Sequence, residues 1–456
     1  MLPRLSAEIF TIPLDEGRYL LYAPLRRSAF IGNARTVNFL ADLKDGIFDE
    51  YADPGGALVQ FLRGLDILDA GMETQSLTVF QGEPEPTTVS LFLTTACNLR
   101  CTYCYASAGD TPKKFMQFDV AKRGIDFVAG NAAKLNAGRF EVAFHGGGEP
   151  TVNWPIMTQA LVYAREKAAE LGLEVSAGAA TNGVMNDTQI DWVIANLESV
   201  SLSCDGLPNV NDQHRLMLNG QGSSERIMHT LRRFDAAGFR YGLRITVTQD
   251  QIPQLPASVE FLCREFNPVR LQVEPVYQLG RGRDAESAET EAFIAAYRAA
   301  RECAYQHGRE LTYSGARLDT LTNHFCGVSR DSFCLSPDGN VSACYEAFAE
   351  DGEVSGVFFY GAPSIDGDGY EFDTAKLEHL RQQAVQHKPY CQGCFAKWHC
   401  AGDCYHKALA ANGPGEFTGS ARCHITRELI KDQILGQIVQ AGGVVWHESA
   451  AFSAAI

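Results

Sequence analysis

Three cysteines fall within the eight residues CNLRCTYC, at positions 97, 101 and 104. Cysteine thiolates bind zinc, copper(I) or iron–sulfur clusters. A structural zinc ion takes four protein ligands, and neither a histidine nor a fourth cysteine follows nearby. A 4Fe–4S cluster held by three cysteines leaves one iron open to a substrate or cofactor. The spacing therefore favours such a cluster, with a zinc site completed by a distant ligand as the alternative.

A strand-like stretch immediately precedes these cysteines. Residues 88–96, TVSLFLTTA, form a short apolar run that is typical of a buried strand. Similar stretches alternate with helical ones such as residues 223–238, which predicts a parallel sheet, either doubly wound or closed as a partial barrel. Chemistry in these folds lies at the C-terminal ends of the strands, where the cysteines are expected. The other predicted strands cover residues 140–147, 173–183, 199–206, 241–248 and 270–276.

Composition and charge limit the classes of function. A chain of 456 residues predicts two or three domains. Its net charge of −16 argues against a nucleic-acid partner, which would require a basic face. The N-terminus lacks the pattern of a signal peptide and no apolar run reaches membrane-spanning length, so we expect no membrane partner and a cytoplasmic location. Thiols stay reduced there, so the fourteen cysteines are candidate metal ligands rather than disulfides.

The pattern divides the chain into four parts. In the first part, two short strands within residues 17–32 precede two helices, residues 33–46 with Asn33 as N-cap and residues 55–68, an order that is typical of a winged-helix unit. The third part has eight cysteines and few periodic segments, so we expect metal rather than an apolar core to organise it. The expected parts are 1–85, winged-helix-like; 86–309, alternating strands and helices; 310–425, cysteine-rich and loop-rich; and 426–456, a helix at 427–438 followed by a loose tail.

The cysteine motif, with Tyr103 as its aromatic residue, resembles the C-x-x-x-C-x-aromatic-C signature of the radical S-adenosylmethionine (SAM) superfamily. The resemblance implies an α/β fold with a partial (β/α)6 TIM-like barrel. It also implies that SAM binds the open iron and that its reductive cleavage gives a 5′-deoxyadenosyl radical, which abstracts hydrogen from a substrate. The later stretch HGGGEPT matches the family's G-G-E-P motif, where glycines permit close backbone approach. By resemblance the residues that contact the SAM amino group are Gly147, Gly148, Glu149 and Pro150.

A third stretch, SLSCDG…NDQHR, is similar to one found in the subgroup that modifies peptides and proteins. It makes Ser203 and Arg215 candidate contacts of the SAM ribose or carboxylate. Arg244 is a further candidate for SAM, with a salt bridge as the alternative, and Asp205 with Gly206 is expected to form a turn. Three cysteines inside predicted elements are expected to be plain buried residues: Cys204, Cys263 and Cys303.

The C-terminal cysteines resemble the seven-cysteine SPASM pattern, C-x9–15-G-x4-C, C-x2-C-x5-C-x3-C, C. The resemblance implies two auxiliary 4Fe–4S clusters besides the SAM cluster, three in all. Cys334 lies outside the pattern and is inferred as a fourth ligand, which would close its cluster and favour electron transfer. A pair of structural zinc ions is the alternative. The implied ligand sets are Cys326, Cys334, Cys344 and Cys404 for the first cluster, and Cys391, Cys394, Cys400 and Cys423 for the second.

The two residues after Cys344 bear on the reaction. The sulfatase-maturing branch carries an Asp there as a base, whereas this chain has Tyr345 and then Glu346. A phenol is a poor base at neutral pH, and Glu346 would point the other way in an extended segment. Both are candidate catalytic residues, and the difference disfavours sulfatase maturation.

The N-terminal part completes the expected function. Residues 1–85 are similar to the winged-helix element by which maturases of ribosomally made peptides bind a leader peptide as an added strand; a cap packed on the barrel is the alternative. We expect a peptide maturase that forms a cross-link or another oxidative modification, reduced by a partner such as flavodoxin or ferredoxin. Maturation of a protein, either a sulfatase or a cross-linked oxidoreductase subunit, is the alternative enzyme, and an iron–sulfur electron carrier or a zinc-stabilised scaffold is the non-enzyme alternative.

Overall fold

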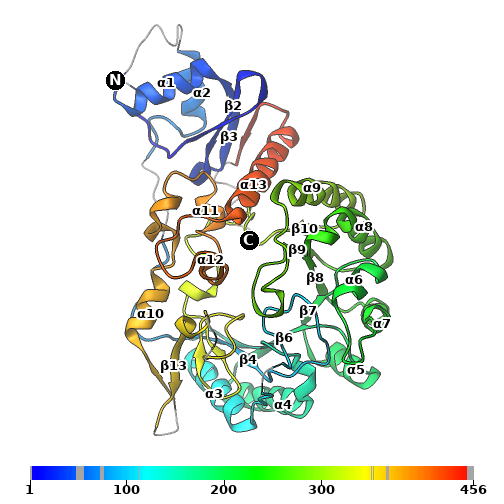
Figure 1. Ribbon diagram of the computed structural model, residues 1–456. Helices are drawn as coiled ribbons and strands as arrows, with labels where there is room; N and C mark the ends of the chain where they lie inside the picture. Colours follow the sequence, from blue (N-terminus) through cyan, green and yellow to red (C-terminus); the bar gives the residue numbers. More distant parts are fainter. Residues whose placement is uncertain are drawn as a thin grey trace.

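The body of the protein is an open sheet of eleven strands (Figure 1). In the computed structural model, which describes residues 3–47, 56–71, 77–110, 112–350, 352, 354–365 and 369–448, the strand order is β10-β9-β8-β7-β6-β5-β4-β11-β12-β13-β14. Neighbours from β10 to β11 run parallel, and the remaining pairs are antiparallel. The sheet curves without closing, which confirms the predicted α/β fold with a partial barrel.

The parallel strands and the helices that cross between them form the barrel part. Each of the six predicted strands is confirmed. A seventh, two-residue strand adds to the edge of β9. Helices pack on the outer face, as α7 does through Ile227, Leu231 and Phe234, which are fully buried. The strands are β4 (Thr88–Phe92), β5 (Arg139–His145), β6 (Glu174–Thr181), β7 (Ser199–Ser203), β8 (Tyr241–Val247), β9 (Leu271–Pro275) and β10 (Leu311–Thr312); the helices are α3 (Phe118–Lys134), α4 (Trp154–Leu171), α5 (Asp187–Asn196), α6 (Pro208–His214), α7 (Ser224–Ala236), α8 (Leu255–Glu265) and α9 (Thr290–Gln306).

The cysteine-rich region is less independent than the sequence predicts. Its strand β11 (Cys334–Leu335) pairs with β4, and Leu335, Val341 and Phe358 are fully buried in the same apolar core as the barrel. The expectation that metal rather than an apolar core organises this region is therefore wrong, because its strands continue the barrel sheet. The remaining elements are β12 (Val341–Ser342), β13 (Phe359–Pro363), β14 (Tyr370–Phe372), α10 (Thr374–Arg381), α11 (Lys397–Cys400) and α12 (Tyr405–Asn412).

The N-terminal residues form a separate small sheet with two helices. Strand β1 (Phe10–Pro13) precedes the two predicted strands, β2 (Arg18–Ala23) and β3 (Ser28–Asn33). The two predicted helices are present as α1 (Ala34–Lys44) and α2 (Ala57–Gly64). The Asn33 side chain accepts a hydrogen bond from the Thr36 amide at 3.1 Å, which confirms the predicted N-cap.

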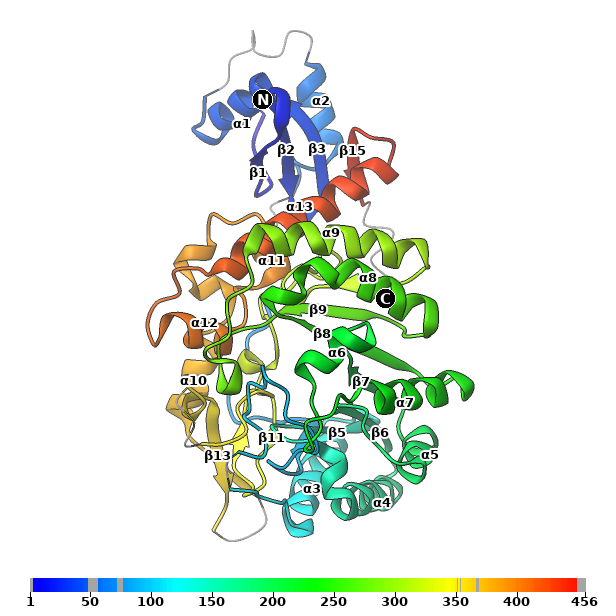
Figure 2. The ribbon, with the colours of Figure 1, turned by 45° about the vertical axis from the view of Figure 1, so that its right-hand side comes forward.

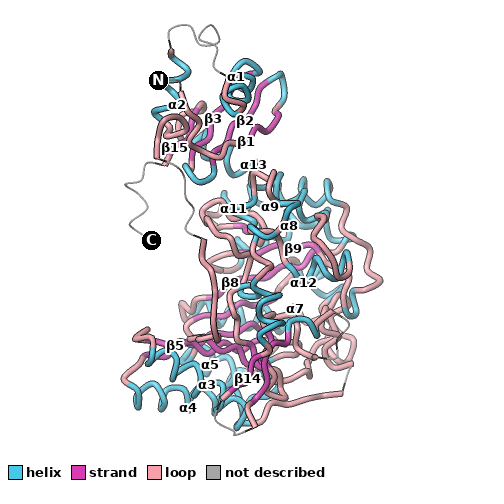
Figure 3. The backbone as a smooth tube through the Cα atoms, turned by 90° about the vertical axis from the view of Figure 1, so that its left-hand side faces the viewer, coloured by secondary structure: helices cyan, strands magenta, loops and turns pink. Residues whose placement is uncertain are grey.

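The C-terminal residues return to this small sheet. Helix α13 (Ala421–Gln440) begins six residues before its predicted start at 427 and includes Cys423. Strand β15 (Val445–His447) then pairs with β3, giving the order β1-β2-β3-β15 (Figures 2 and 3). The prediction of a loose tail is thus wrong for 445–447, since Trp446 is buried against the sheet; residues 449–456 lie outside the described residues. Within the described part of the chain, no helix is both long and apolar enough to cross a membrane.

Candidate functional site

A cavity of about 260 Å³ lies at the C-terminal ends of the parallel strands. All three cysteines of the CNLRCTYC motif line it, so the strand order brings the predicted elements together at one place. Of the residues predicted for the SAM cluster, SAM and catalysis, two are not among the lining residues: Pro150, which starts the buried turn η4 (Pro150–Asn153), and Tyr345. The predicted residues that do line the cavity are Cys97, Cys101, Tyr103, Cys104, Gly147, Gly148, Glu149, Ser203, Arg215, Arg244 and Glu346.

The glycines after β5 let two loops touch. A Cβ atom on Gly148 would lie 2.2 Å from the carbonyl oxygen of Ala96, the residue that precedes Cys97. The amide of Glu149 donates to the same oxygen at 2.9 Å. Only glycine fits at position 148 for this reason, and the contact fixes the cysteine loop against the G-G-E-P turn.

Glu149 is held entirely by the protein. One carboxylate oxygen accepts from the hydroxyls of Thr181 at 2.8 Å and Thr151 at 2.9 Å, and the other accepts from the Asn182 amide at 2.7 Å. Burial raises the pKa of this carboxyl, although these hydrogen bonds act in the opposite direction. The sequence suggested that this carboxylate faces an ammonium group, whereas its donors in the structure make it a brace between β5 and β6.

A buried network also holds the aromatic residue of the cysteine motif. The Tyr103 hydroxyl donates to the Asp205 carboxylate and accepts from the Arg215 guanidinium at 3.0 Å. Asp205 is 2% exposed and also accepts from the Thr246 amide at 3.1 Å. Burial raises the pKa of Asp205 while Arg215 opposes the rise. Asp205 was expected only in a turn; its place at the end of β7 was the signal that it faces the site.

Arg281 is a second residue of the site that the sequence did not predict. Its amide donates to the Cys104 carbonyl at 3.0 Å and its Nε donates to the Cys101 carbonyl at 2.9 Å. The neighbouring Gly280, with φ +57, leaves no room for a Cβ, which would lie 2.3 Å from the Tyr105 oxygen. The G-R-G sequence after β9 therefore clamps the cysteine loop, and two glycines flanking an arginine were its only sequence signal.

Two cationic side chains in the cavity fit an anionic ligand group. Arg244 makes no hydrogen bond or ion pair with the residues that the structure describes, and it extends from β8 into the cavity. The Nε atom of Arg215 is buried, again without a partner among the described residues. Unpaired buried donors cost free energy, so a carboxylate bound here would satisfy both. The donor set thus fits the carboxylate of SAM.

The lining of the cavity also carries a second polar group, which comes from the cysteine-rich region. The Glu346 carboxylate accepts from the Tyr277 hydroxyl at 2.6 Å and lies 3.2 Å from Nδ1 of the buried His406. Burial would raise the pKa of Glu346, but the His406 hydrogen bond and the Lys407 charge outweigh it and lower the pKa. Tyr345 is 38% exposed and its ring lies 5.0 Å from that of His145. Of the two predicted catalytic candidates, only Glu346 reaches the cavity.

The cavity cysteines fit metal ligands. Burial raises the pKa of Cys97 to about 12, so without a metal the thiol would stay protonated at neutral pH. A bound metal centre replaces such protons. Among the described residues, no three histidine, cysteine or acidic side chains are placed as ligands of a single metal ion.

The auxiliary cysteines form two sets that match the predicted ones in part. Four of them, on α11, α13 and the preceding loop, line one small cavity of about 20 Å³: Cys391, Cys394, Cys400 and Cys423. In the other set, burial raises the pKa of Cys344, and the neighbouring Glu346, Cys404 and Cys326 raise it further. Burial likewise raises the pKa of Cys334. The nearby Cys326 raises it further, while a hydrogen bond with Ser90 lowers it.

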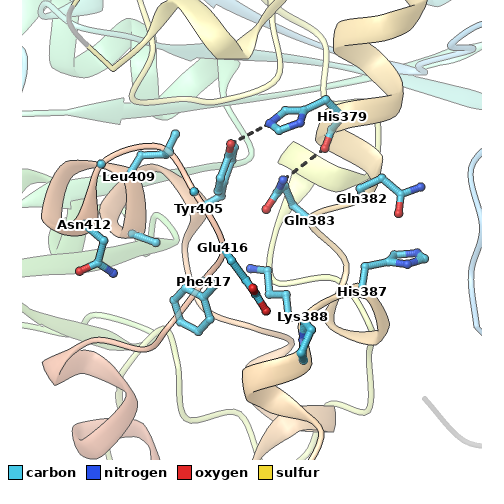
Figure 4. A pocket seen from close by; sticks show the side chains of 14 residues that line it. His379, Gln382, Gln383, His387, Lys388, Tyr405, Leu409, Asn412, Glu416 and Phe417 are labelled. Carbon is cyan, nitrogen blue, oxygen red and sulfur yellow. Dashed lines mark hydrogen bonds between the residues drawn. The ribbon is translucent and has the colours of Figure 1, made fainter.

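The other cysteines and a further cavity lie apart from these sets. Cys204 and Cys263 are buried in the core, as predicted, while Cys303 on α9 is only half-buried. A cavity of about 270 Å³ lies between α10, α12 and the loop after α12 (Figure 4). In it, His379 Nε2 lies 2.8 Å from the Tyr405 hydroxyl. No cysteine lines this cavity, and none of the predicted site residues does.

The fold and the site together define a class: a partial barrel whose first strand ends in a three-cysteine loop facing a glycine-rich turn. Residues 91–257 match the family model described as the radical SAM superfamily, so this part of the chain is a radical SAM domain.

Individual relatives are distant. The Fe-coproporphyrin III synthase of Methanosarcina barkeri is 28% identical over 240 residues, 52% of this chain and 55% of the relative. The mycofactocin maturase MftC of Mycolicibacterium smegmatis is 26% identical over 356 residues, 73% of this chain and 83% of the relative. The chain spans little more than half the length of the first two curated relatives that it matches.

Solved structures share the fold. A structure of anSMEcpe with bound AdoMet has a TM-score of 0.62 at 16% identity, covering 77% of this chain and 94% of that one. Streptococcus suis SuiB bound to S-adenosylmethionine has a TM-score of 0.53 at 14% identity, and covers 92% of this chain and 99% of that one. The second similarity therefore covers more of this chain than the first.

Proposed function

We propose that the protein is a radical SAM peptide maturase, which abstracts hydrogen from a ribosomally made precursor peptide and leaves a cross-link or another oxidative modification. The observation that carries the proposal is the cavity itself. One part of its lining holds Cys97, Cys101 and Cys104 beside Arg244 and the unpartnered Nε of Arg215, and another part holds an ionised carboxylate, Glu346, from the C-terminal region.

The cysteines, arginines and glycines of the cavity lining would bind the cofactors. Cys97, Cys101 and Cys104 would hold a 4Fe–4S cluster, and Arg215 and Arg244 would bind the SAM carboxylate, with Ser203 at the ribose. The backbone at Gly147 and Gly148 would receive the amino group, since the Glu149 carboxylate is already bonded to protein donors. When bound, the cluster and SAM supply the radical that removes a hydrogen atom.

Glu346 and its hydrogen-bond partners would act on the substrate. Losing a hydrogen atom and then an electron leaves a substrate that must also release a proton. Glu346 is ionised at neutral pH and lies against the Tyr277 hydroxyl and His406, so it can take that proton and share it with His406. Tyr345 is not assigned a role, because it does not line the cavity.

The auxiliary cysteines would hold two more 4Fe–4S clusters, three in all. Cys326, Cys344 and Cys404, with Cys334 as the fourth ligand, would hold the one nearer to Glu346. Because its ligand Cys344 lies close to Glu346, this cluster is well placed to take the electron that the substrate releases. A flavodoxin or ferredoxin would reduce the SAM cluster. Thiols that must stay reduced suit the cytoplasm.

The N-terminal sheet would bind the precursor. Residues 10–33 form the antiparallel strands to which an extended peptide can add. The similarity to SuiB, which has been solved bound to precursor peptide SuiA and covers 92% of this chain, supports a peptide substrate. A fixed cap on the barrel is the alternative role for these residues.

The names of the relatives define the alternatives. The mycofactocin maturase name supports a peptide substrate, whereas the name Fe-coproporphyrin III synthase belongs to an enzyme that makes an iron porphyrin. Maturation of a folded protein such as a sulfatase is the remaining alternative. It is disfavoured because the residue that directly follows Cys344 lies outside the cavity.

Anaerobic co-expression with a candidate precursor, such as any short peptide encoded beside this gene, tests the proposal. We expect a peptide lighter by two hydrogen atoms, or a multiple of two, with fragmentation locating the new bond. The matched control is Cys97→Ala, which should leave the peptide unmodified. An unmodified peptide from cells whose enzyme carries all its iron and cleaves SAM would contradict the peptide assignment, and coproporphyrin or a sulfatase would then be tried as the substrate.

A further inference from the structure

The small N-terminal sheet is completed by a strand from the other end of the chain. Strand β15 pairs antiparallel with β3, with Val445 opposite Phe30 and His447 opposite Ser28. The backbone pairing continues on both sides, because the Ile31 amide donates to the Val444 carbonyl at 3.2 Å and the Glu448 amide donates to the Arg27 carbonyl at 3.1 Å. Without β15, the edge of β3 would present unpaired backbone groups, which are the groups that an added strand binds.

The side chains of β15 alternate between two apolar faces. Trp446 is 6% exposed, and its ring lies 6.4 Å from that of Tyr22 in a stacked arrangement. Val445 packs on the opposite face, in the core that α1 and α2 share with the sheet. His447 Nδ1 lies 2.5 Å from the Ser28 hydroxyl, and Glu448 forms an ion pair with Arg27. The edge thus receives an aliphatic, an aromatic, a polar and an acidic residue in that order.

The attachment of β15 is short. Its strand register covers residues 28–30, with one further hydrogen bond on each side at Arg27 and Ile31, whereas the other neighbour, β2, pairs with all of 28–33. Between α13 and β15 the chain turns at Gly442 and Gly443, with φ +107 and +96, and no atom lies within 4 Å of a Cβ at either position. The strand can therefore leave the sheet by a change at this turn while α13 stays in place.

The opposite edge of the sheet is a poorer binding site. Strand β1 is four residues long and ends at Pro13, which has no amide hydrogen to donate. Its Phe10 ring also lies 5.7 Å from Lys397 of α11. The edge of β3 is longer and contains no proline, so it is the better place for an added strand.

We propose that the β3 edge is the binding site for an extended segment of the precursor peptide, and that β15 is its intramolecular occupant, which the peptide displaces. The segment has an aliphatic residue followed by an aromatic one, with an acidic residue two positions after the aromatic one. This inference rests on the proposed function, because it assigns the place and the chemistry of precursor binding.

Fluorescence anisotropy with a labelled peptide of sequence GVVWHE, residues 443–448 of this chain, tests the inference. Three holoenzymes are compared: the full chain, a chain that ends at Gly443, and the full chain with Trp446→Ala. We expect the shortened chain and W446A to bind the peptide at least tenfold more tightly than the full chain. The matched control peptide carries alanine in place of tryptophan and should not bind the shortened chain.

Two outcomes would overturn the inference. Equal affinity for all three holoenzymes would place the binding elsewhere on the surface. No binding to W446A, in samples that retain the iron content and SAM cleavage of the full chain, would make β15 a fixed strand; this variant decides the matter if the shortened chain does not fold. Formation of 5′-deoxyadenosine is measured in the same samples, so a failure of the proposed enzymatic function is seen independently of peptide binding.

Discussion

The Tyr22 hydroxyl on β2 lies 2.6 Å from Nε2 of His399, the residue directly before Cys400. Nδ1 of His399 lies 3.0 Å from the Thr320 carbonyl, so Nδ1 carries the proton and Nε2 accepts from the tyrosine. Burial lowers the pKa of His399 to about 4, which keeps the ring neutral and this arrangement intact. The N-terminal sheet is thereby bonded to the helix that carries one of the auxiliary cysteines.

Replacing Tyr22 with phenylalanine tests this bond. Tyr22→Phe leaves the Nε2 acceptor of His399 buried and unpaired, which costs about 1–3 kcal/mol in the free energy of unfolding. We expect the first transition in urea denaturation of the holoenzyme to move to lower urea concentration. Tyr19→Phe, also on β2, is the matched control, because no described residue bonds to the Tyr19 hydroxyl. Equal stability of the two variants would show that the bond contributes nothing.

The cysteine triad can be tested apart from the other clusters. The variant with Cys97, Cys101 and Cys104 all replaced by alanine should form no 5′-deoxyadenosine from SAM under reduction and should lose about four irons per chain. Cys303→Ala is the control, since Cys303 lies half-buried on α9 away from the cavity. SAM cleavage by the triple variant would refute the assignment of these ligands.

The features that the sequence predicts correctly depend on residues close together in the chain. The barrel strands are recognisable from short apolar runs, the Asn33 cap from one residue, and the cavity cysteines from their spacing. The missed features depend on pairings between distant residues. The partner of β3 is a three-residue segment more than 400 positions away, too short to have a pattern of its own. Asp205 and Tyr277 acquire their roles only when Tyr103 and Glu346 fold against them.

Cys334 is the ligand assignment that most needs a test, because it lies outside the seven-cysteine pattern. It is fully buried on β11, next to Ser90 of β4, and Cys326 is its neighbour among the thiols. If it completes a cluster, Cys334→Ala should lower the iron content and change the electron paramagnetic resonance spectrum of one auxiliary cluster. Cys263→Ala, another buried cysteine, is the control. An unchanged spectrum in C334A would make Cys334 an ordinary core residue.

The cavity geometry separates the two catalytic candidates. Glu346→Gln removes the proton acceptor, and general bases contribute about 10²–10⁴-fold to rates. We therefore expect at least about a 100-fold decrease in the formation of modified peptide, while 5′-deoxyadenosine still forms without coupling to product. Tyr345→Phe should leave the rate unchanged, since Tyr345 packs against the ring of His145 but does not itself line the cavity. The reverse pattern would move the catalytic role to Tyr345.

His145 should make the free energy of unfolding depend on pH. Its Nδ1 accepts from the Gly146 amide at 2.7 Å, and burial lowers its pKa to about 4, with Glu346 acting to raise it and Arg244 to lower it. The unfolded value is about 6.5. Between these two values the unfolded chain binds a proton that the folded chain does not. The stability that His145 contributes is therefore complete above about pH 6.5 and falls as the pH decreases toward 4, by up to about 1.4 kcal/mol per pH unit.

Urea denaturation between pH 4.5 and about 7 measures this slope. His145→Gln should reduce the slope of the unfolding free energy against pH relative to the unmodified chain. The exposed His387→Gln is the matched control and should retain it. Because His399 is also buried in its neutral form, only the difference between the unmodified chain and H145Q is assigned to His145. If the slopes are equal, His145 is protonated in the folded protein, and its hydrogen bond from Gly146 must then be lost at low pH.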